Sequence, residues 1–182
     1  MEDVLKVMRE SGFKPKANVD EDFPAIKGEY RVDVKALKPW IGKESGDKEA
    51  YMLELRVTET LSGDKADGRN FSRFYRVGGK MREWKDGVSH DRDVSATDVI
   101  ESLKALASDV YTLEGAPTLD MSSTEAFEAG FADIIGRTGY VRAWHFPSRD
   151  DADKKVQQWV LKQEKHLKKD AKGAAGKDKL PY

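Results

Sequence analysis

Cysteine is absent from this 182-residue sequence. Disulfide bridges, thiolate metal sites and cysteine nucleophiles are therefore excluded. Long apolar runs are missing as well, because no stretch approaches ~18 uncharged apolar residues, so we expect no membrane-spanning helix. The acidic residues that follow Met1 argue against a signal peptide. We therefore expect a cytoplasmic protein without membrane contact.

The signatures of common enzymes are also missing. The sequence has no phosphate-binding loop of the Gly-x-x-x-x-Gly-Lys type and no nucleophile elbow. His145 and His166 have no identifiable partners, and residues 90–93 (His-Asp-Arg-Asp) suit a solvated loop before a helix better than a metal site. We expect no enzymatic activity, no cofactor and no bound metal.

Charge of one sign does not dominate, since the formal net charge is −1 although 36% of the residues are charged. The lysines gather late in the chain. Residues 162–179 hold seven lysines against three acids, a balance of +4 that leaves −5 for the remainder. A polyanion would therefore need a local basic patch, helped by this late segment.

Composition and pattern divide the chain into three parts. Residues 1–22 are predicted to form an N-terminal arm or short helix, and residues 23–164 one folded domain. Residues 165–182 are predicted to form a flexible basic tail, because Lys, Asp, Ala and Gly cannot bury enough apolar surface to become ordered.

Alternation with a period of two predicts three strands in the first half of the domain. The inward side chains are Tyr30, Val32, Val34 and Ala36 in the first strand, which Pro39 ends, and Tyr51, Leu53, Leu55 and Val57 in the second. A third strand is predicted over residues 69–77, before Gly78 and Gly79. Polar loops over residues 42–49 and 62–68 connect the three strands.

Helical spacing appears next. Ser95 or Thr97 can cap a helix near residues 97–108, and a capping box over residues 122–125 begins a helix near residues 123–135 that Gly136 stops. The predicted buried stripes are Val99, Ile100, Leu103 and Leu106 in the first helix and Phe127, Phe131, Ile134 and Ile135 in the second.

The chain then returns to strand patterns. Residues 140–146 alternate until Pro147, and residues 155–163 are interpreted as a last strand, with the start of a C-terminal helix as the alternative. The predicted fold is mainly β with a helical insertion (α+β). Its β-β-β-α-β-β order is that of an OB-fold-like five-stranded barrel, while an open sheet is the other arrangement the pattern allows.

The stretch over residues 23–34 (Phe-Pro-Ala-Ile-Lys-Gly-Glu-Tyr-Arg-Val-Asp-Val) resembles the opening strand of a group of phage-encoded proteins. Residues 52–60, the Gly-rich loop after them and residues 68–71 (Gly-Arg-Asn-Phe) resemble that group too. Its members are similar to single-stranded DNA-binding proteins with an OB-fold, and the resemblance extends over residues 23–146. It implies a role in phage DNA replication or recombination in the host cytoplasm, no catalytic residues, and a DNA-facing strand over residues 69–76.

Residues 69–76 (Arg-Asn-Phe-Ser-Arg-Phe-Tyr-Arg) interleave three arginines with three aromatic rings. A single strand needs cations for its phosphates and flat rings for its bases, so this segment is the main binding candidate. Alternation puts Phe71, Arg73 and Tyr75 on one face and Asn70, Ser72, Phe74 and Arg76 on the other. The sequence leaves open which face is exposed, and Phe71 and Tyr75 suit a core equally well.

Other rings among cations extend the candidate site. Trp84 lies among Lys80, Arg82 and Lys85, whereas Trp40 suits either a stacking platform or a plug at the end of a barrel. The face with Tyr140, Arg142, Trp144 and Phe146 is either exposed or the core side. The full predicted nucleic-acid-binding set is Trp40, Arg56, Arg69, Phe71, Arg73, Phe74, Arg76, Lys80, Arg82, Trp84, Arg142 and Trp144.

Two functions compete at this point. One is sequence-tolerant binding of single-stranded DNA; the alternative, which the acidic balance of −5 favours, is a protein-interaction module, a phage factor that binds a host or virion protein. Leu180, Pro181 and Tyr182 resemble the docking tips of single-strand binders, so they are a candidate contact for replication or recombination enzymes. The sequence leaves open whether the protein is a homo-oligomer and whether RNA is bound.

Overall fold

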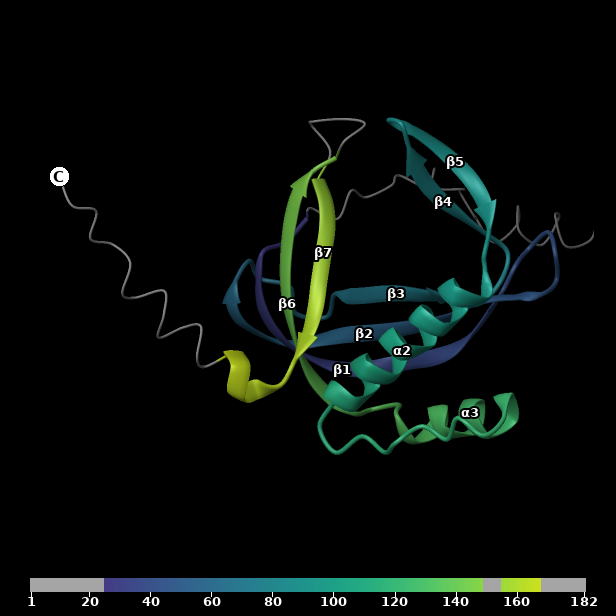
Figure 1. Ribbon diagram of the computed structural model, residues 1–182. Coiled ribbons are helices and arrows are strands. Elements are labelled where there is room, and N and C mark those ends of the chain that lie inside the picture. Colours follow the sequence, from purple (N-terminus) through teal and green to yellow (C-terminus); the bar gives the residue numbers. More distant parts are fainter. Residues whose placement is uncertain (1–24, 149–154, 168–182) are drawn as a thin grey trace, which may run out of the picture.

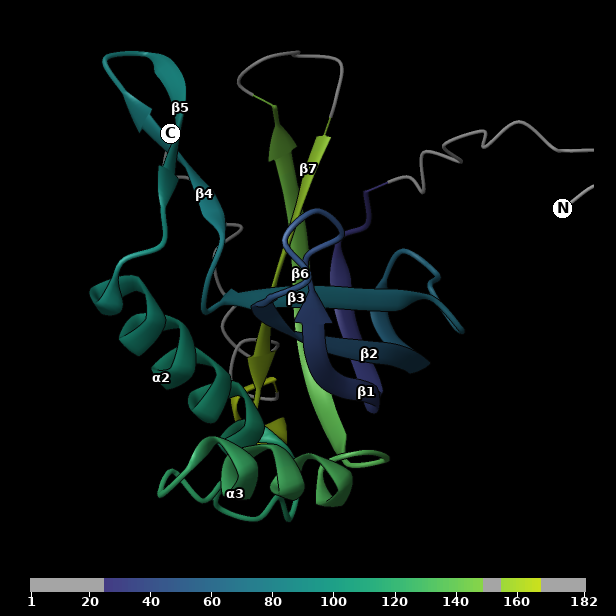
Figure 2. The same ribbon diagram turned by 90° about the vertical axis from the view of Figure 1, so that its right-hand side faces the viewer.

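The computed structural model describes residues 25–148 and 155–167 (Figures 1 and 2). The strands are β1 (Gly28–Ile41), β2 (Lys48–Gly63), β3 (Asn70–Arg76), β4 (Lys80–Lys85), β5 (Val88–Asp93), β6 (Thr138–Pro147) and β7 (Lys155–Lys162). The helices are α2 (Ala96–Thr112), α3 (Thr124–Ala129) and the 3-10 helix η1 (Gly130–Asp133). Residues 164–167 form one further helical turn, so residues 165–167 of the predicted flexible tail are ordered. The predicted arm over residues 1–22 and residues 168–182 of the predicted tail lie outside the described residues.

The described chain is mainly β with a few helices, as predicted. Five strands form one antiparallel sheet in the order β3-β2-β1-β6-β7, and β4 and β5 form a separate two-stranded sheet. Figure 1 shows β6 and β7 rising across the end of the β1–β2–β3 part of the sheet, with α2 in front. One hydrophobic core lies between the inner side of the sheet and the helices.

β1 departs from strict alternation, which corrects two sequence predictions. A register shift between Val34 and Ala36 adds one residue, so Leu37 is buried where Ala36 was expected. The strand also continues through Pro39 to Ile41. Proline is tolerated because β6 pairs only with Gly28–Asp33, which leaves the later part of β1 with β2 as its single neighbour.

The two edges of the sheet, β3 and β7, approach each other without pairing. Within the described residues their backbones share no ladder, so the sheet is not a closed barrel. Side chains span the gap instead, since the rings of Phe71 and Trp159 have centroids 5.8 Å apart. The strand interpretation of residues 155–163 is confirmed by β7, and on β6 the small Val141 and Ala143 face the core.

α2 begins where the sequence indicated, and two of the four predicted stripe residues are confirmed, because Leu106 is buried and Leu103 packs against the core. Ser95 is the N-cap, and its side chain and that of Asp98 form a reciprocal capping box. The buried residues are Leu106 and Val110, whereas Ile100 is 52% exposed. The prediction for Ile100 was wrong because the helix packs on β3 and β7 along its Leu106–Val110 side. At about 100° per residue, Ile100 points roughly 100° away from the middle of that stripe.

α3 is shorter than predicted. Ser123, not the expected box over residues 122–125, caps it by accepting a hydrogen bond from the amide of Ala126. Phe127 and Phe131 pack on the Tyr51 ring at centroid distances of 5.4 and 5.3 Å. The helical segment ends at Asp133, three residues before the expected stop at Gly136, which has a φ of 80° in the turn that follows. Ile135 lies in this turn and is 53% exposed rather than buried.

The β4–β5 hairpin was not predicted, and residues 90–93, expected to be a loop, form part of β5. Its turn is Asp86-Gly87, with φ values of 53° and 78°. Asp-Gly between two short strands is the sequence signal of such a two-residue turn. Figure 2 shows the hairpin standing apart from the five-stranded sheet, beyond the first turn of α2.

Candidate nucleic-acid interface

The structure decides which face of β3 is exposed. Phe71 and Tyr75 are 4% and 3% exposed and point into the core, whereas Phe74 is 45% exposed on the outer side. Asn70, Ser72 and Arg76 share that outer side by alternation. The outer face of β1, β2 and β3 is therefore the surface on which the predicted segment can meet a ligand.

Phe71 is removed from the candidate site by its packing. Its ring lies between Tyr30 and Trp159, at centroid distances of 5.9 and 5.8 Å. A ring enclosed in this way offers no face to a base. The expectation that Phe71 contacts DNA is corrected, and the core alternative holds for Phe71 and Tyr75.

Arg73 is held by partners inside the protein. Its Nη1 donates to Asp109 Oδ2 at 2.7 Å, Nη2 donates to the Trp159 carbonyl, and the guanidinium carbon lies 3.9 Å from the Trp159 ring centroid. Tyr75 donates to the same Asp109 oxygen, and burial, followed by the Asp109 charge, raises the pKa of this phenol well above its usual range. Arg73 therefore joins β3 to α2 and β7, and the prediction that it contacts DNA is corrected because its guanidinium is engaged within the protein.

Trp40 and Phe74 come together on the outer face. Their rings meet edge to face at a centroid distance of 5.2 Å, with Trp40 39% exposed. The register explains the contact, because Phe74 pairs with Met52, Met52 with Lys38, and Trp40 lies two positions beyond Lys38. Trp40 is thus a surface ring and not a plug. We call this surface the Trp40–Phe74 face and define it as Lys38, Trp40, Met52, Arg56, Phe74 and Arg76.

The cations of the Trp40–Phe74 face are largely available. Lys38 and Arg56 are exposed, and neither has an ion pair in the part of the chain that the structure describes. Arg76 reaches Glu49 only at 3.5 Å with its side chain 42% exposed. Two further carboxylates lie nearby. Glu54 is bound to Lys35 at 2.9 Å, and Asp33, which is opposite Arg56 in the register, accepts a hydrogen bond from the Thr138 hydroxyl at 2.9 Å. Sequence reasoning missed Lys38, because its outward position depends on the register shift in β1.

The β4 candidates lie on a hairpin of balanced charge. Lys80 and Arg82 are exposed, and Arg82 pairs with Asp91 at 3.9 Å. Trp84 lies within β4, but its side chain is not among those described. The hairpin holds equal numbers of bases and acids, Lys80, Arg82, Lys85 and Arg92 against Glu83, Asp86, Asp91 and Asp93. It is therefore not a basic arm.

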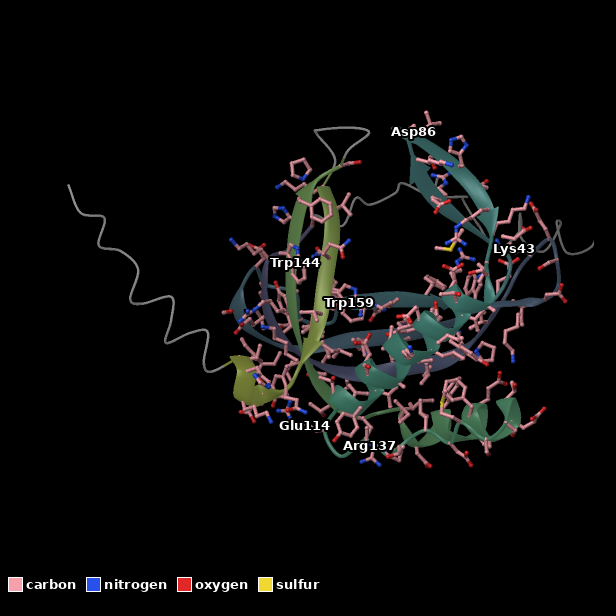
Figure 3. The ribbon with its side chains drawn as sticks, viewed as in Figure 1. Lys43, Asp86, Glu114, Arg137, Trp144 and Trp159 are labelled. Carbon is pink, nitrogen blue, oxygen red and sulfur yellow. The ribbon has the colours of Figure 1, made fainter. Side chains whose placement is uncertain are left out.

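The β6 candidates form a separate location. Arg142 donates to Glu29 from Nε and Nη2, at 3.0 and 2.5 Å, so its charge is engaged. Trp144 is 39% exposed and Phe146 43%, which settles the open alternative in favour of exposed rings at this end of the strand. β6 pairs with β1 only over Gly28–Asp33, so these rings lie away from the Trp40–Phe74 face; Figure 3 shows Trp144 beside the Trp159 strand.

Arg69 lies at the gap between the two sheet edges. It lines a pocket of about 460 Å³ with Phe71 from β3 and with Gln157 and Trp159 from β7. This pocket is where a barrel would close.

Charge is divided between two halves of the molecule. The helical segment, residues 95–137, holds eight acids and two bases, a balance of −6. The other described residues hold 19 bases and 14 acids, a balance of +5. The acidic total that favoured a protein partner therefore resides in the helices, and the sheet half, which carries the Trp40–Phe74 face, is basic.

No group of three His, Asp or Glu side chains suited to a metal ion occurs within residues 25–148 and 155–167. No helix in these ranges is long and apolar enough to cross a membrane.

Comparison with models of known protein families gives no match, and comparison with curated proteins gives none. The docking candidates Leu180, Pro181 and Tyr182 lie outside the described residues.

Proposed function

We propose that the protein binds single-stranded DNA, without sequence preference, on the Trp40–Phe74 face. The observation that carries this proposal is the exposed ring pair itself. Two large rings in contact, 39% and 45% exposed, lie among Lys38, Arg56 and Arg76. Exposed aromatic rings are stabilised when apolar surface is removed from water, and unstacked bases can stack on their flat faces.

The arrangement favours a single strand over a duplex. Base faces are accessible to protein rings only where the bases are unstacked, and stacking contributes roughly 1–3 kcal/mol per base. Each phosphate neutralised by a cation adds affinity that salt weakens. Rings and cations on one β surface therefore suit a chain whose phosphates and bases are both free to turn toward the protein.

We propose further that the sheet is an OB-fold. That fold is a partly open five-stranded barrel whose second and third strands present the ligand face. The order β3-β2-β1-β6-β7, with α2 between the third and fourth strands of the sheet, supports this assignment. The Trp40–Phe74 face then lies where that fold holds oligonucleotides, beside the loop that follows β1.

The separation of charge between the two halves also supports DNA binding on the Trp40–Phe74 face. A basic sheet half (+5) faces a polyanion and an acidic helical half (−6) repels it. Together with the resemblance of residues 23–146 to phage-encoded binders, this supports a role beside phage replication or recombination enzymes in the host cytoplasm. The protein would hold the strand and leave the chemistry to those partners.

The experiment is a fluorescence-anisotropy titration of a labelled oligo-dT at several salt concentrations. Three cations on the face predict a slope of log affinity against log salt of about −2 or steeper, which is roughly a 20-fold loss between 50 and 200 mM. Double-stranded DNA of equal length should bind more weakly. Absence of oligo-dT binding at the lowest salt would contradict the proposal and favour a protein partner.

A further inference from the structure

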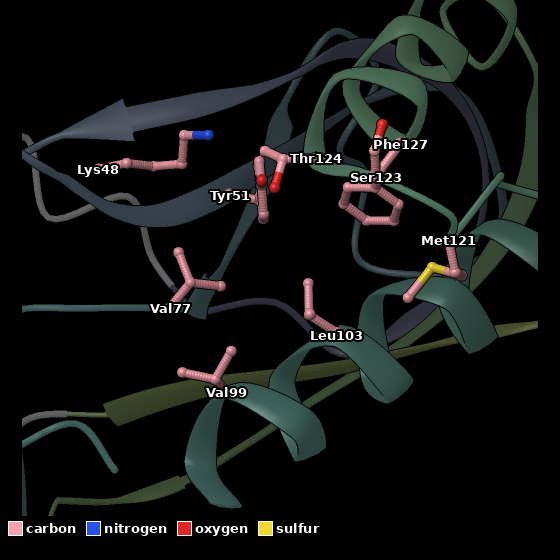
Figure 4. A pocket seen from close by; sticks show the side chains of 9 residues that line it. All are labelled: Lys48, Tyr51, Val77, Val99, Leu103, Met121, Ser123, Thr124 and Phe127. Carbon is pink, nitrogen blue, oxygen red and sulfur yellow. The ribbon is translucent and has the colours of Figure 1, made fainter. Parts of the chain in front are cut away.

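A groove runs along α2 on the side of the molecule away from the Trp40–Phe74 face. It consists of two adjoining pockets of about 340 and 470 Å³, and Met121 lines both. Figure 4 shows the first pocket, with Val99 and Leu103 of α2 opposite Phe127 of α3. The second continues past Ala107 and Tyr111 to Leu119. We call these two pockets together the α2 groove.

The α2 groove leaves apolar side chains uncovered. Tyr111 is 73% exposed and Met121 58%, the two highest values among the exposed large hydrophobic residues in the described ranges. Both line the second pocket. A continuous apolar groove with such exposure is typical of a surface that another segment covers.

The surroundings of the groove are acidic. The helical segment that forms most of it carries the balance of −6, and only part of that charge is neutralised by neighbours, as in the pair Asp98–Arg92. Lys48 of β2, the one charged residue that lines the two pockets, is paired with Glu128. Asp120 and Glu125, which flank groove residues in sequence, are exposed. An occupant of the groove should therefore combine apolar side chains with lysines or arginines.

Residues 168–182 of the same chain have this composition. They hold five lysines against two aspartates, followed by Leu180, Pro181 and Tyr182. We propose that this segment docks in the α2 groove, with its lysines facing the carboxylates of the helical half and with Leu180 and Tyr182 in the pockets beside Met121.

The described chain ends close to the groove. Leu167 and Glu164 share a pocket with Tyr140, and Glu114, two residues after α2 ends, donates its backbone N–H to the Thr138 carbonyl at 2.8 Å. The Glu114 and Glu164 carboxylates both help to raise the pKa of Tyr140, after burial, so both lie near that ring. Fifteen extended residues span up to ~50 Å, about twice the ~25 Å length of α2, so the segment reaches the whole groove.

The test uses two introduced thiols in the full chain, which has no cysteine of its own. Thr118 is exposed and lines the groove, so the test variant combines Thr118→Cys with Lys179→Cys in residues 168–182. The matched control combines Lys179→Cys with Glu59→Cys. Glu59 is exposed and lines the pocket that contains Leu167, so an undirected segment meets it at least as often.

Docking predicts that the Thr118 variant forms its intramolecular disulfide at least about fivefold faster than the Glu59 variant, because docking raises the local thiol concentration. Leu180→Ala with Tyr182→Ala, or salt of about 1 M, should remove the difference. Far-ultraviolet circular dichroism checks that each variant is folded. Equal rates in the two variants, or disulfides formed only between two chains, would overturn the proposal.

Discussion

Phe71 and Phe74 are three residues apart on β3, yet the first is 4% exposed and the second 45%. The difference follows from the two-residue period of a strand, which sends odd and even positions to opposite sides. Only Phe74 has an exposed ring face that a base could stack on. Phe71 is almost fully buried, so its truncation would remove a large apolar contact area from the core. The interleaved segment therefore divides into core residues and exposed residues. Its arginines differ as well, since Arg73 is bound to Asp109 at 2.7 Å, while Arg76 reaches Glu49 only at 3.5 Å and is 42% exposed.

At this scale the sequence reveals which residues belong together but not which side they face. Three arginines and three rings within residues 69–76 identified the segment, and the same alternation fitted either assignment. The decision depends on Trp159, which is distant in sequence and covers Phe71 and Arg73. No local pattern shows that contact, because it forms only when β7 approaches β3.

Substitution Phe74→Ala should weaken oligo-dT binding roughly 5- to 150-fold, which corresponds to the ~1–3 kcal/mol of one stacked base. The free energy of unfolding should fall by about 0.5–1.5 kcal/mol, because the edge-to-face contact with Trp40 is lost. Anisotropy titration and urea unfolding measure the two quantities. Ile100→Ala, which removes an exposed apolar side chain on α2 outside both the Trp40–Phe74 face and the α2 groove, is the matched control and should bind like wild type. Equal effects of the two substitutions would show that Phe74 does not stack.

At the scale of elements, the β4–β5 hairpin is tied to α2 through one carboxylate. Asp98 accepts from Arg92 Nη1 and Nη2 at 2.6 and 2.8 Å, and from the Ser95 hydroxyl and amide at 2.6 and 2.8 Å. These bonds, that from Arg92 first, hold the pKa of Asp98 well below its usual range. A single side chain therefore caps the helix and fixes the base of the hairpin.

Replacement Asp98→Asn should lower the free energy of unfolding at about pH 7. Because the folded-state pKa is lower than the unfolded one, the stabilisation is present above about pH 4 and is lost as the pH falls toward the folded-state value. Urea unfolding of both proteins across this range should show their difference shrinking below about pH 4. The control Asp91→Asn loses only a contact at 3.9 Å and should differ little from wild type. A difference between Asp98→Asn and wild type that does not change with pH would contradict the role of the carboxylate.

Elements with a strong local signal were predicted well, and those set by neighbours were not. The inward set of β2 and the N-cap Ser95 agree with the structure because alternation and capping are local properties. The β4–β5 hairpin was missed although Asp86-Gly87 is a turn signal, since the short strands around it are mostly charged. The register shift near Val34, and with it the place of Lys38, depends on pairing with β2.

At the scale of the whole molecule, charge separates two faces that net charge conceals. The formal total of −1 arises from an acidic helical half and a basic sheet half. Composition alone therefore favoured a protein partner, whereas the arrangement of the elements separates an acidic side from a basic side, on which the proposed DNA strand would lie. The mainly β fold class could be predicted from the order of the elements. The open gap between β3 and β7 could not be predicted, because it depends on how strongly the sheet curls.

Equal changes in net charge should have unequal effects on the two halves. Lys38→Glu should weaken oligo-dT binding and flatten the salt slope by about 0.7 or more, because a phosphate contact is lost and a repulsive charge is added. Lys104→Glu on α2 changes the net charge equally and should leave the slope unchanged. Both slopes come from anisotropy titrations over the same salt series. Matching slopes would indicate that binding responds only to total charge.

The most direct test of the central claim maps where a bound strand lies. Ultraviolet irradiation of the complex with oligo-dT joins thymine to rings that it touches, and mass spectrometry of the digested protein identifies the attached peptides. The account predicts attachment to the peptides that contain Trp40 and Phe74. Attachment confined to residues 96–133 of the helical half, or none at saturating protein, would contradict it.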